Sequence, residues 1–322
     1  MKNILVTGGA GYIGSKVSYE LKDRGYNVII VDNLSTGNKK QIGSNFTFYK
    51  VDLKKLNNLI KIIKKYKIHA IFHFAGLTNV KDSEKNKKKY YVNNVLTTVN
   101  ILKLLKIFSI KYFIFSSSAS VYGNQKNICV KESSNKNPQS NYGKNKLTCE
   151  NRIKLFSKKY KFNYAILRYF NVVGPDKKMR CGPLHNGSLF SNISKAIKSK
   201  KKINIYGDNY NTKDGTAIRD YIDVNDLSEL HILSLHKIMR KSLVLNCGYN
   251  KGYSVLNVIN TFNKLLKNKI KYLIKKPRPE DIEKIYANTE LLRKNFPKWK
   301  RKYSLIKTIK NIIVWERFKI KK

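Results

Sequence analysis

An apolar run that gives way to glycines at residues 6–16 restricts the fold more than any other part of the sequence. Residues 2–7 (KNILVT) predict a strand, and a helical pattern follows. Gly8, Gly11 and Gly14 lie between the two, with the spacing Gly-x-x-Gly-x-x-Gly. Glycine permits a tight turn and a close approach of the backbone to a pyrophosphate, to which the helix N-terminus offers N–H donors. The stretch therefore predicts a dinucleotide-binding turn.

The second apolar run ends in an acidic residue. Residues 27–32 (NVIIVD) predict a strand whose last residue is Asp32. A carboxylate at this place can accept hydrogen bonds from both hydroxyls of an adenosine ribose, and it repels a 2′-phosphate. The alternative is an ordinary glycine turn with a surface aspartate. The strand–turn–helix context favours the cofactor site, and Asp32 favours NAD over NADP.

Short apolar runs and longer helical patterns alternate through the first half of the chain. Further strands are predicted at 45–52, 70–76, 111–118 and 163–169, and helices at 56–66, 84–108 and 141–160. Such alternation is typical of a parallel sheet covered on both faces, whose ligands lie beyond the carboxyl ends of the strands. We predict an α/β fold in which residues 1–172 form a Rossmann-type doubly wound parallel sheet that binds NAD.

The pattern changes after Asn171. A loop with glycine and proline spans 172–187, and shorter strands and helices follow it. We predict a smaller C-terminal mixed α/β substrate lobe over 173–322, with part of 218–248 packing back on the first domain. The cleft between two such lobes is the natural place for a substrate.

The chain is strongly basic, with 66 Lys+Arg against 20 Asp+Glu and a formal net charge of +46 at pH 7. Proteins that bind nucleic acid concentrate their basic residues in a stripe or a tail. Here lysines occur in almost every segment, beside Asn, Ile and Tyr, whose codons are A/T-rich. We attribute the charge to genomic composition and predict no nucleic-acid partner.

The cysteines and histidines predict neither a metal site nor disulfides. Cys129, Cys149, Cys181 and Cys247 are far apart and form no Cys-x-x-Cys pair, and the five histidines are scattered. The apolar run at residues 4–6 is too short for a signal peptide or a membrane span. We expect a cytoplasmic protein without a membrane partner.

One tyrosine–lysine pair has the spacing of a known catalytic base. In SNYGKNK (140–146) the tyrosine precedes the lysine by four residues. The same spacing recurs in other places: Tyr12/Lys16, Tyr122/Lys126, Tyr272/Lys276 and Tyr303/Lys307. The first of these lies in the phosphate turn, so Lys16 is expected on the helix surface, and the last two lie far from any predicted cofactor strand. The pair at Tyr122 is the serious rival, although it lies in an apparent loop.

Seven motifs follow one another over nearly the whole chain. They are VTGGAGYIGS (6–15), VDNLSTG (31–37), HFAGLTNV (73–80), FSSSASVYG (115–123), PQSNYGKNK (138–146), LRYFNVVGP (167–175) and DGTAIRDYIDV (214–224). Together they resemble the UDP-glucose 4-epimerases, which belong to the extended short-chain dehydrogenases/reductases. The glycine turn and Tyr-x3-Lys are shared by that superfamily. The combination of HFAGL, SSSASVYG, RYFN and DGT-x2-RDY is more specific to the epimerases.

The resemblance implies a role for each matched position. Tyr142 is implied to be the catalytic base, Lys146 its activator and Ser118 a hydrogen-bonding partner. NAD is implied to lie among Gly8, Gly11, Tyr12, Ile13, Gly14, Asp32, Asn33, Asp52, Leu53, Phe74, Ala75, Gly76, Leu77, Asn93, Ser118, Tyr142, Lys146 and Phe170. The nucleotide sugar is implied to lie among Ser118, Tyr142, Asn171, Tyr206, Arg219 and Arg278.

Elementary chemistry agrees with these roles. The pKa of a free tyrosine is about 10, so a phenolate near pH 7 requires a drop of about 3 units. One nearby cation contributes about 1–3 units. Lys146 lies one helical turn from Tyr142 on the same face, and a nicotinamide cation would add to the effect. Arg219 and Arg278 suit a diphosphate, because guanidinium offers two parallel N–H bonds to an oxyanion.

The chain departs from the family pattern in four places, one of which spans two positions. Thr78 stands where epimerases commonly carry a lysine near the cofactor phosphates, and Asp223 replaces the histidine of YIHV. PRPED (277–281) lacks the first arginine and the glycine of the usual RRPGD, which weakens the assignment of Arg278. Ile285 falls where family members use a small or a large residue to admit or exclude an N-acetyl group, and isoleucine is intermediate.

The implied reaction is the reversible inversion of C4 in UDP-galactose and UDP-glucose through a 4-keto sugar. UDP-pentose and UDP-N-acetylglucosamine epimerases remain open alternatives. A dehydratase needs an acidic residue shortly after the active-site serine, where this chain has Ala119 and Ser120, and a UDP-glucuronate decarboxylase is a further rival. An intact Ser118–Tyr142–Lys146 set argues against a non-catalytic NAD- or nucleic-acid-binding protein.

The resemblance also implies a homodimer. The family commonly dimerises through the helices that follow residues 84 and 141. Tyr90, Tyr91, Leu102 and Leu105 could contribute to such an interface, and packing in the core is the alternative for each of them.

Overall fold

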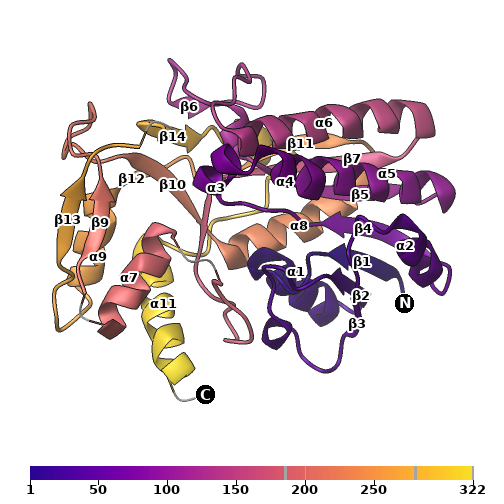
Figure 1. The fold of residues 1–322 in the computed structure, drawn as a ribbon, viewed down its shortest axis with the longest axis horizontal. Helices are drawn as coiled ribbons and strands as arrows, with labels where there is room; N and C mark the ends of the chain where they lie inside the picture. The colour runs from indigo at the N-terminus through magenta and orange to yellow at the C-terminus, as the bar shows by residue number, and fades with distance from the viewer. Residues whose placement is uncertain (185–186, 200, 279–280, 321–322) are drawn as a thin grey trace.

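The computed structural model describes residues 1–184, 187–199, 201–278 and 281–320, and it divides into a larger and a smaller lobe (Figure 1). A parallel sheet of seven strands, in the order β11-β7-β5-β4-β1-β2-β3, forms the larger lobe. The strands are β1 (Asn3–Thr7), β2 (Asn27–Asp32), β3 (Thr47–Lys50), β4 (Ile68–His73), β5 (Tyr112–Ser118), β7 (Asn163–Tyr169) and β11 (Leu243–Cys247). The predicted α/β fold with a doubly wound parallel sheet is confirmed.

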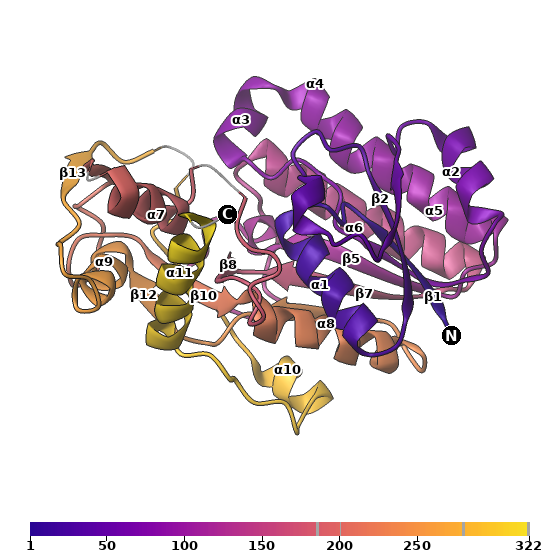
Figure 2. The same ribbon diagram turned by 90° about the horizontal axis from the view of Figure 1, so that it is seen from below.

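Helices cover both faces of this sheet (Figure 2). On one face α1 (Tyr12–Asp23) and α8 (Val224–Ile238) pack together, and on the other lie α2 (Leu56–Ile63), α5 (Thr97–Ile107) and α6 (Asn141–Tyr160). Side chains alternate along each strand, so Ile4 and Val6 join the first core and Leu5 joins the second. Both faces of every central strand are therefore buried, which explains their nearly continuous apolar runs.

The helix predicted over 84–108 is interrupted. The structure instead has α3 (Val80–Lys85), α4 (Lys87–Tyr90), a π-helical turn (Tyr91–Leu96) and then α5. The side chain of Asn94, within the π-helical turn, accepts a hydrogen bond from the Leu77 amide (2.7 Å) and donates one to the Leu77 carbonyl oxygen (2.9 Å). The wider turn thus coincides with a tertiary contact that no local periodicity encodes.

The smaller lobe is built from short strands and three helices among the described residues. A mixed sheet runs in the order β12-β10-β14-β6, β8 pairs with β10, and β9 pairs with β13. The bounds are β6 (Cys129–Val130), β8 (Asn171–Val173), β9 (Ile203–Tyr206), β10 (Ile218–Asp223), β12 (Gly252–Ser254), β13 (Tyr272–Lys275) and β14 (Lys284–Ala287). The helices are α7 (Leu189–Ser199), α9 (Val255–Asn263) and α11 (Leu305–Ile320), whereas α10 (Glu290–Asn295) packs against β11 in the larger lobe.

Two connections tie the lobes together. Strand β11 and helix α8 come from the second half of the chain but complete the larger lobe. Strand β6 comes from the first half but pairs with β14, through Tyr286↔Cys129 and Ala287↔Val130. The lobes therefore exchange segments rather than following one another along the sequence.

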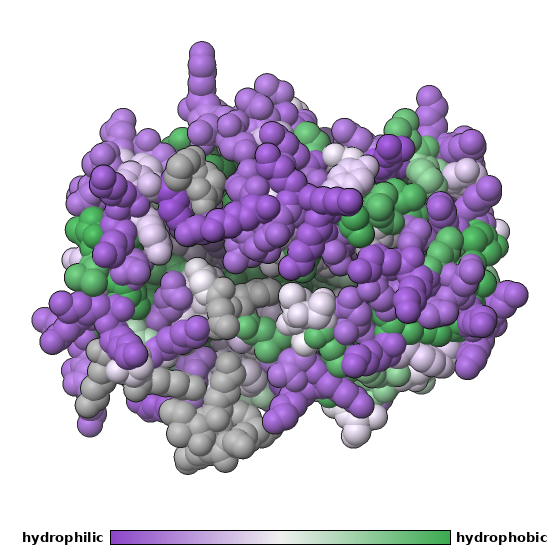
Figure 3. Space-filling model, in the orientation of Figure 1, coloured by the Kyte–Doolittle hydropathy of each residue, from purple (hydrophilic) through white to green (hydrophobic). Residues whose placement is uncertain are grey.

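The surface in Figure 3 is mostly hydrophilic, with separate apolar patches. Among the residues that the structure describes, no helix combines the length and the apolar character needed to cross a bilayer.

Candidate active site

The glycine turn after β1 has the geometry that its sequence predicts. Gly8 has a φ of +71°, and a Cβ added there would lie 2.5 Å from the backbone nitrogen of Ala75. A Cβ at Gly14 would overlap the carbonyl oxygen of Gly8. Helix α1 begins after Gly11, which has no side chain to cap it. The turn therefore brings backbone N–H groups and open space together at the carboxyl edge of the sheet.

A cavity extends from this turn along the edges of β2 and β4. All fourteen residues that the resemblance assigned to NAD, from Gly8 to Asn93, line it: Gly8, Gly11, Tyr12, Ile13, Gly14, Asp32, Asn33, Asp52, Leu53, Phe74, Ala75, Gly76, Leu77 and Asn93. Asn94 was not predicted, although it fixes the backbone of Leu77 in the cavity wall. Its only signal in the sequence is its place beside Asn93 in the YVNNV stretch.

Asp32 is held at the wall of this cavity by the turn itself. Its carboxylate accepts hydrogen bonds from the amides of Ala10 (3.0 Å) and Leu34 (2.8 Å). Burial raises the pKa of Asp32, and these two hydrogen bonds oppose the rise. The side chain is thus an oriented acceptor with unused lone pairs, as a ribose diol requires.

A larger cleft of about 940 Å³ lies between the lobes. The six residues assigned to the nucleotide sugar all line it: Ser118, Tyr142, Asn171, Tyr206, Arg219 and Arg278. Phe170 also faces this cleft rather than the glycine-turn cavity, and Lys146 lines neither. Thr78 lines both cavities, so the cleft and the glycine-turn cavity are adjacent at this residue.

Tyr142 is positioned by the start of α6. Ser140 caps this helix by accepting a hydrogen bond from the Gly143 amide (3.1 Å), and the Tyr142 amide donates to Ser83 Oγ (3.1 Å). The phenol is 8% exposed and lies beside Ser118, at the end of β5, whose Oγ donates to Ser120 Oγ (3.1 Å). One turn later, Lys146 Nζ donates to the carbonyl oxygen of Ser116 (2.6 Å) and lies 5.8 Å from the centre of the Tyr142 ring.

Burial dominates the acidity of both groups. It raises the pKa of Tyr142 to about 12, although Ser118 opposes the rise. It lowers the pKa of Lys146 to about 8. Lys146 is not among the groups that lower the pKa of Tyr142, so the drop expected from it is absent in the chain itself.

The rival pair at Tyr122 has a different environment. Tyr122 is buried, and its hydroxyl donates to Asn246 Oδ1 (2.6 Å) while accepting from Arg168 Nη1 (2.8 Å). Lys126 is exposed and lines neither cavity. Tyr122 thus packs in the core beneath the cleft, whereas Tyr142 reaches the cleft.

The expectation that Lys16 lies on the helix surface is wrong. Its side chain is 1% exposed, with Nζ 3.1 Å from Glu20 Oε2 and 3.0 Å from Asp176 Oδ1. Asp176 belongs to the loop after β8, which covers this part of α1. Because that carboxylate comes from a distant segment, the helical pattern around Lys16 carried no sign of its burial.

Two arginines and an aromatic ring line one part of the cleft. The guanidinium of Arg278 lies 4.4 Å from the centre of the Tyr206 ring, and its Nε donates to Asp281 Oδ2 (3.0 Å). Arg219 Nη1 donates to the carbonyl oxygens of Ile218 (2.9 Å) and Glu283 (3.2 Å). Despite the altered motif around Arg278, both arginines face the same cleft.

Two of the other departures also have clear surroundings. Asp223 is buried, caps α8 by accepting from the Asn225 amide (2.8 Å), and accepts from Thr308 Oγ1 (2.7 Å). Asp223 lines neither cavity, so this replacement affects the packing of the protein interior rather than the cleft. Ile285 is 4% exposed, lines the cleft and packs in a cluster with Ala119 and Phe170.

Within the described residues, no three His, Cys, Asp or Glu side chains come together in a way that could hold a metal ion.

Comparison with known proteins agrees with this geometry. The NAD dependent epimerase/dehydratase family matches residues 4–248, and the chain belongs to this family. The UDP-glucose 4-epimerase of Lactobacillus helveticus is 38% identical over 295 residues, which cover 90% of this chain and 89% of that protein. The predicted resemblance is confirmed.

Solved structures show the same similarity in three dimensions. The UDP-glucose 4-epimerase of Bifidobacterium longum in complex with NAD⁺ and UDP has a TM-score of 0.93 and 32% identity, and the match covers 98% of each chain. The UDP-glucose-4-epimerase of Stenotrophomonas maltophila with bound NAD and formylated UDP-arabinopyranose has a TM-score of 0.94 and 31% identity, with 100% of this chain and 99% of that chain covered.

Proposed function

We propose that this chain interconverts UDP-galactose and UDP-glucose by reversible inversion at C4, with NAD as a retained cofactor. One observation carries the proposal. Ser118 and Tyr142 line the same cleft as Arg219 and Arg278, and Thr78 lines both that cleft and the glycine-turn cavity. A nucleotide sugar whose diphosphate meets the arginines would therefore present its hexose to the serine, the tyrosine and a neighbouring dinucleotide.

The glycine-turn cavity fits NAD. Its turn has no room for side chains at Gly8 and Gly14, and Asp32 offers oriented acceptors for the ribose. The amides at the start of α1 would hold the pyrophosphate. When bound, NAD supplies the acceptor for the hydride that leaves C4 and later returns it to the opposite face of the sugar.

The residues at the end of β5 and the start of α6 would move the proton. Tyr142 takes the proton of the 4-hydroxyl while Ser118 holds that oxygen, and it gives the proton back after the 4-keto sugar has turned over. Burial raises the pKa of Tyr142 to about 12, so its ionisation requires positive charge nearby. Lys146 and the nicotinamide ring are the proposed sources of that charge.

A direct assay tests the proposal. The purified chain is incubated with UDP-galactose without added NAD, and UDP-glucose is measured. We expect conversion, and we expect none above background in Tyr142→Phe. A chain that has been loaded with NAD and still converts no UDP-hexose would contradict the proposal.

Ile285 leaves the preferred sugar to experiment. Its side chain is intermediate in size between those that would admit and exclude an N-acetyl group, and it lines the cleft beside Ala119 and Phe170. The same assay with UDP-N-acetylgalactosamine and a UDP-pentose ranks the alternatives. Faster turnover of either one would reassign the substrate while leaving the C4 inversion in place.

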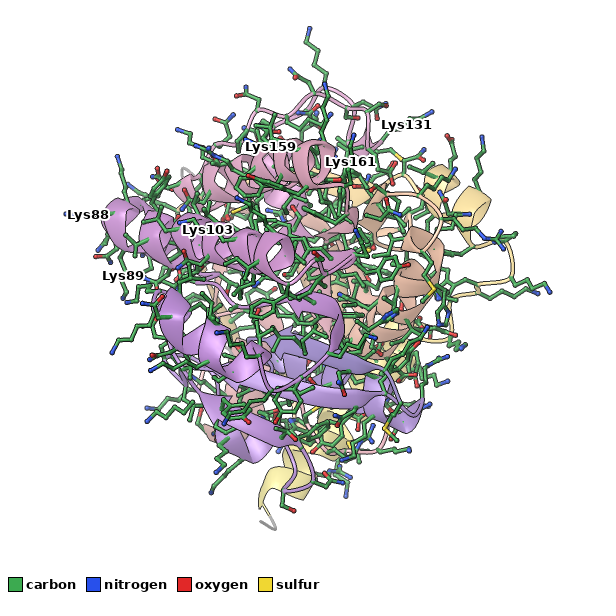
Figure 4. All side chains as sticks on the ribbon, turned by 90° about the vertical axis from the view of Figure 1, so that its right-hand side faces the viewer. Lys88, Lys89, Lys103, Lys131, Lys159 and Lys161 are labelled. Atoms are coloured by element: carbon green, nitrogen blue, oxygen red, sulfur yellow. The ribbon has the colours of Figure 1, made fainter. Side chains whose placement is uncertain are left out.

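We also propose a homodimer through α5 and α6. Of the four residues predicted for the interface, Tyr90, Leu102 and Leu105 are buried in the core, whereas Tyr91 is 43% exposed. Other apolar side chains are exposed along these helices: Leu96, Ile107 and Leu155. Lysines labelled in Figure 4 project from the same side of the molecule, so we expect salt to favour the dimer by screening their repulsion. Light scattering across a salt series tests this.

We propose an NAD-binding domain over residues 1–172 and a substrate lobe over 173–322. In this division β11 and α8 pack as part of the first domain. The proposed compartment is the cytoplasm, and the four free thiols are compatible with its reducing conditions.

A further inference from the structure

A buried ion pair lies beneath the active site. Arg168, on β7, and Glu150, on α6, are 1% and 0% exposed. The guanidinium binds the carboxylate through two bonds, Nε to Oε1 (2.9 Å) and Nη2 to Oε2 (2.7 Å). An arginine inside an otherwise apolar strand is costly to bury unless it is fully paired. No step of the proposed reaction uses either residue.

The pair is the centre of a network that joins several elements. Ser117 Oγ, on β5, donates to Glu150 Oε1 (2.6 Å). Arg168 Nη1 donates to the Tyr122 hydroxyl (2.8 Å) and to the Glu132 carbonyl oxygen (3.0 Å). The segment that contains Glu132 follows β6, which pairs with the strand that carries Ile285. The network thus reaches from the sheet to the floor of the sugar cleft.

The same network also reaches the proposed catalytic residues, through helix α6 and through strand β5. Glu150 follows Lys146 by one helical turn and Tyr142 by about two turns, so all three lie on one face of α6. Three successive residues of β5 face these groups: the Ser116 carbonyl oxygen accepts from Lys146, the Ser117 hydroxyl donates to Glu150, and Ser118 lies beside Tyr142. A shift of α6 along β5 would break all of these contacts together.

The charges around Lys146 give the pair an electrostatic role as well. The titratable groups that face it are Tyr142, Cys149 and Glu150 on α6, and His73 on β4. Cys149 and Glu150 oppose the burial that lowers the pKa of Lys146. Burial raises the pKa of the Cys149 thiol, so Glu150 supplies the negative charge near neutral pH. His73 is buried, and burial lowers its pKa to about 3, so it is neutral beside the ammonium.

We propose that Arg168 and Glu150 form a positioning pair for the proposed epimerase reaction: they hold α6 in register with β5 and keep Lys146 charged. The proposal rests on the proposed function for its kinetic part only. A purely structural ion pair would stabilise the fold without affecting the titration of Lys146. The titration of Lys146 therefore distinguishes a positioning pair from a purely structural one.

The test uses Glu150→Gln, which keeps the shape of the side chain and removes its charge. We expect the Lys146 side chain, followed by NMR with labelled lysine and assigned with Lys146→Met, to titrate about one pH unit lower. The sign follows because the loss of a neighbouring negative charge disfavours the ammonium. In the pH profile, the alkaline limb of kcat should move down by the same amount. At its optimum kcat should fall about tenfold or more, with KM little changed.

Asp176→Asn is the matched control, because it breaks the other buried pair, Lys16–Asp176, away from the reacting groups. It should lower the Tm without moving the Lys146 titration. If Glu150→Gln does not fold, Glu150→Leu/Arg168→Met leaves no unpaired charge. We expect a shift of the same sign but smaller, because Glu150 acts on Lys146 and the Arg168 cation is removed with it.

An unchanged Lys146 titration in the Glu150 variant, or an equal shift in the control, overturns the proposal. The NMR titration does not depend on turnover. A wild-type chain without epimerase activity would therefore contradict the proposed function, while the shift would still decide the electrostatic link.

Discussion

The glycine-turn cavity and the large cleft are built in opposite ways. The cavity is shaped mainly by backbone: glycines without room for a Cβ, amides at a helix start, and an aspartate oriented by two backbone N–H groups. The cleft is lined by side chains that come from both lobes, including Tyr142, Tyr206, Arg219 and Arg278. A backbone-built site accepts one ligand and tolerates little change, whereas a site built from side chains can change its preference through single substitutions.

We expect the largest effect from Tyr142→Phe, because it removes the proposed proton carrier from the cleft. We expect kcat to fall by roughly 10²–10⁴-fold, the range for loss of general acid–base catalysis. Bound NAD should remain, since the phenyl ring still fills the same space. An assay of UDP-hexose conversion together with the NAD content of the purified protein measures both. Wild-type turnover in this variant would rule out the assigned role.

Gly14→Val tests the backbone-built cavity. The added Cβ would overlap the Gly8 carbonyl oxygen, so the turn must open. Overpacking of about 1–3 kcal/mol corresponds to roughly 10–100-fold weaker NAD binding, measured by titration of the cofactor-free chain. Gly25→Ala is the control: its φ is +81° and its Cβ would meet nothing within 4 Å. It should cost about 1–2 kcal/mol of stability and leave NAD affinity unchanged.

Arg219→Met tests the cleft built from side chains. Loss of charge-assisted hydrogen bonds to the diphosphate should cost about 1.5–3 kcal/mol, which is a rise in KM of roughly 10–100-fold with a smaller change in kcat. NAD content should not change, because Arg219 lines only the cleft. Lys126→Met removes an exposed cation outside both cavities and should leave KM unaltered. Equal KM values for Arg219→Met and the wild type would remove this arginine from the substrate site.

Substitutions of Ile285 should have the smallest effect on turnover, and they test substrate specificity most directly. Replacement by Cys enlarges the cleft and replacement by Tyr narrows it, so the ratio of UDP-N-acetylgalactosamine to UDP-galactose turnover should rise in the first and fall in the second. A change of about tenfold is expected for a pocket that gains or loses a few carbon atoms. Competition between the two substrates in one reaction measures the ratio directly. Parallel changes for both substrates would show that Ile285 only supports packing.

The sequence predicts the larger lobe well because its signals are local. The glycine turn, the apolar strands and the helical faces each lie within one short segment, and the seven-stranded sheet follows from their alternation. The π-helical turn escapes prediction because it coincides with the contact between Asn94 and Leu77, which are distant in sequence. The burial of Lys16 escapes for the same reason, since its partner Asp176 belongs to another segment.

The site residues show the same difference between local signals and contacts that are distant in sequence. Gly8, Gly14 and Asp32 can be identified from spacing and context, whereas Arg219 and Arg278 could be singled out only through the family motifs. Periodicity says nothing about which of 66 Lys+Arg faces a ligand. Arg168 did leave a signal, a charged residue within the apolar run YAILRYF, but its partner Glu150 on a different element has no counterpart in that pattern.

Strand β6 has a mechanical consequence. It leaves the larger lobe, hydrogen-bonds to β14 in the smaller one and returns, while β11 and α8 cross in the opposite direction. Wide separation of the two lobes would break the hydrogen bonds between β6 and β14. Hinge bending is therefore restrained to small angles. A ketone that must present its other face to the same nicotinamide would then have to rotate inside an almost rigid chamber, and the dimensions of that chamber would limit which sugars can turn.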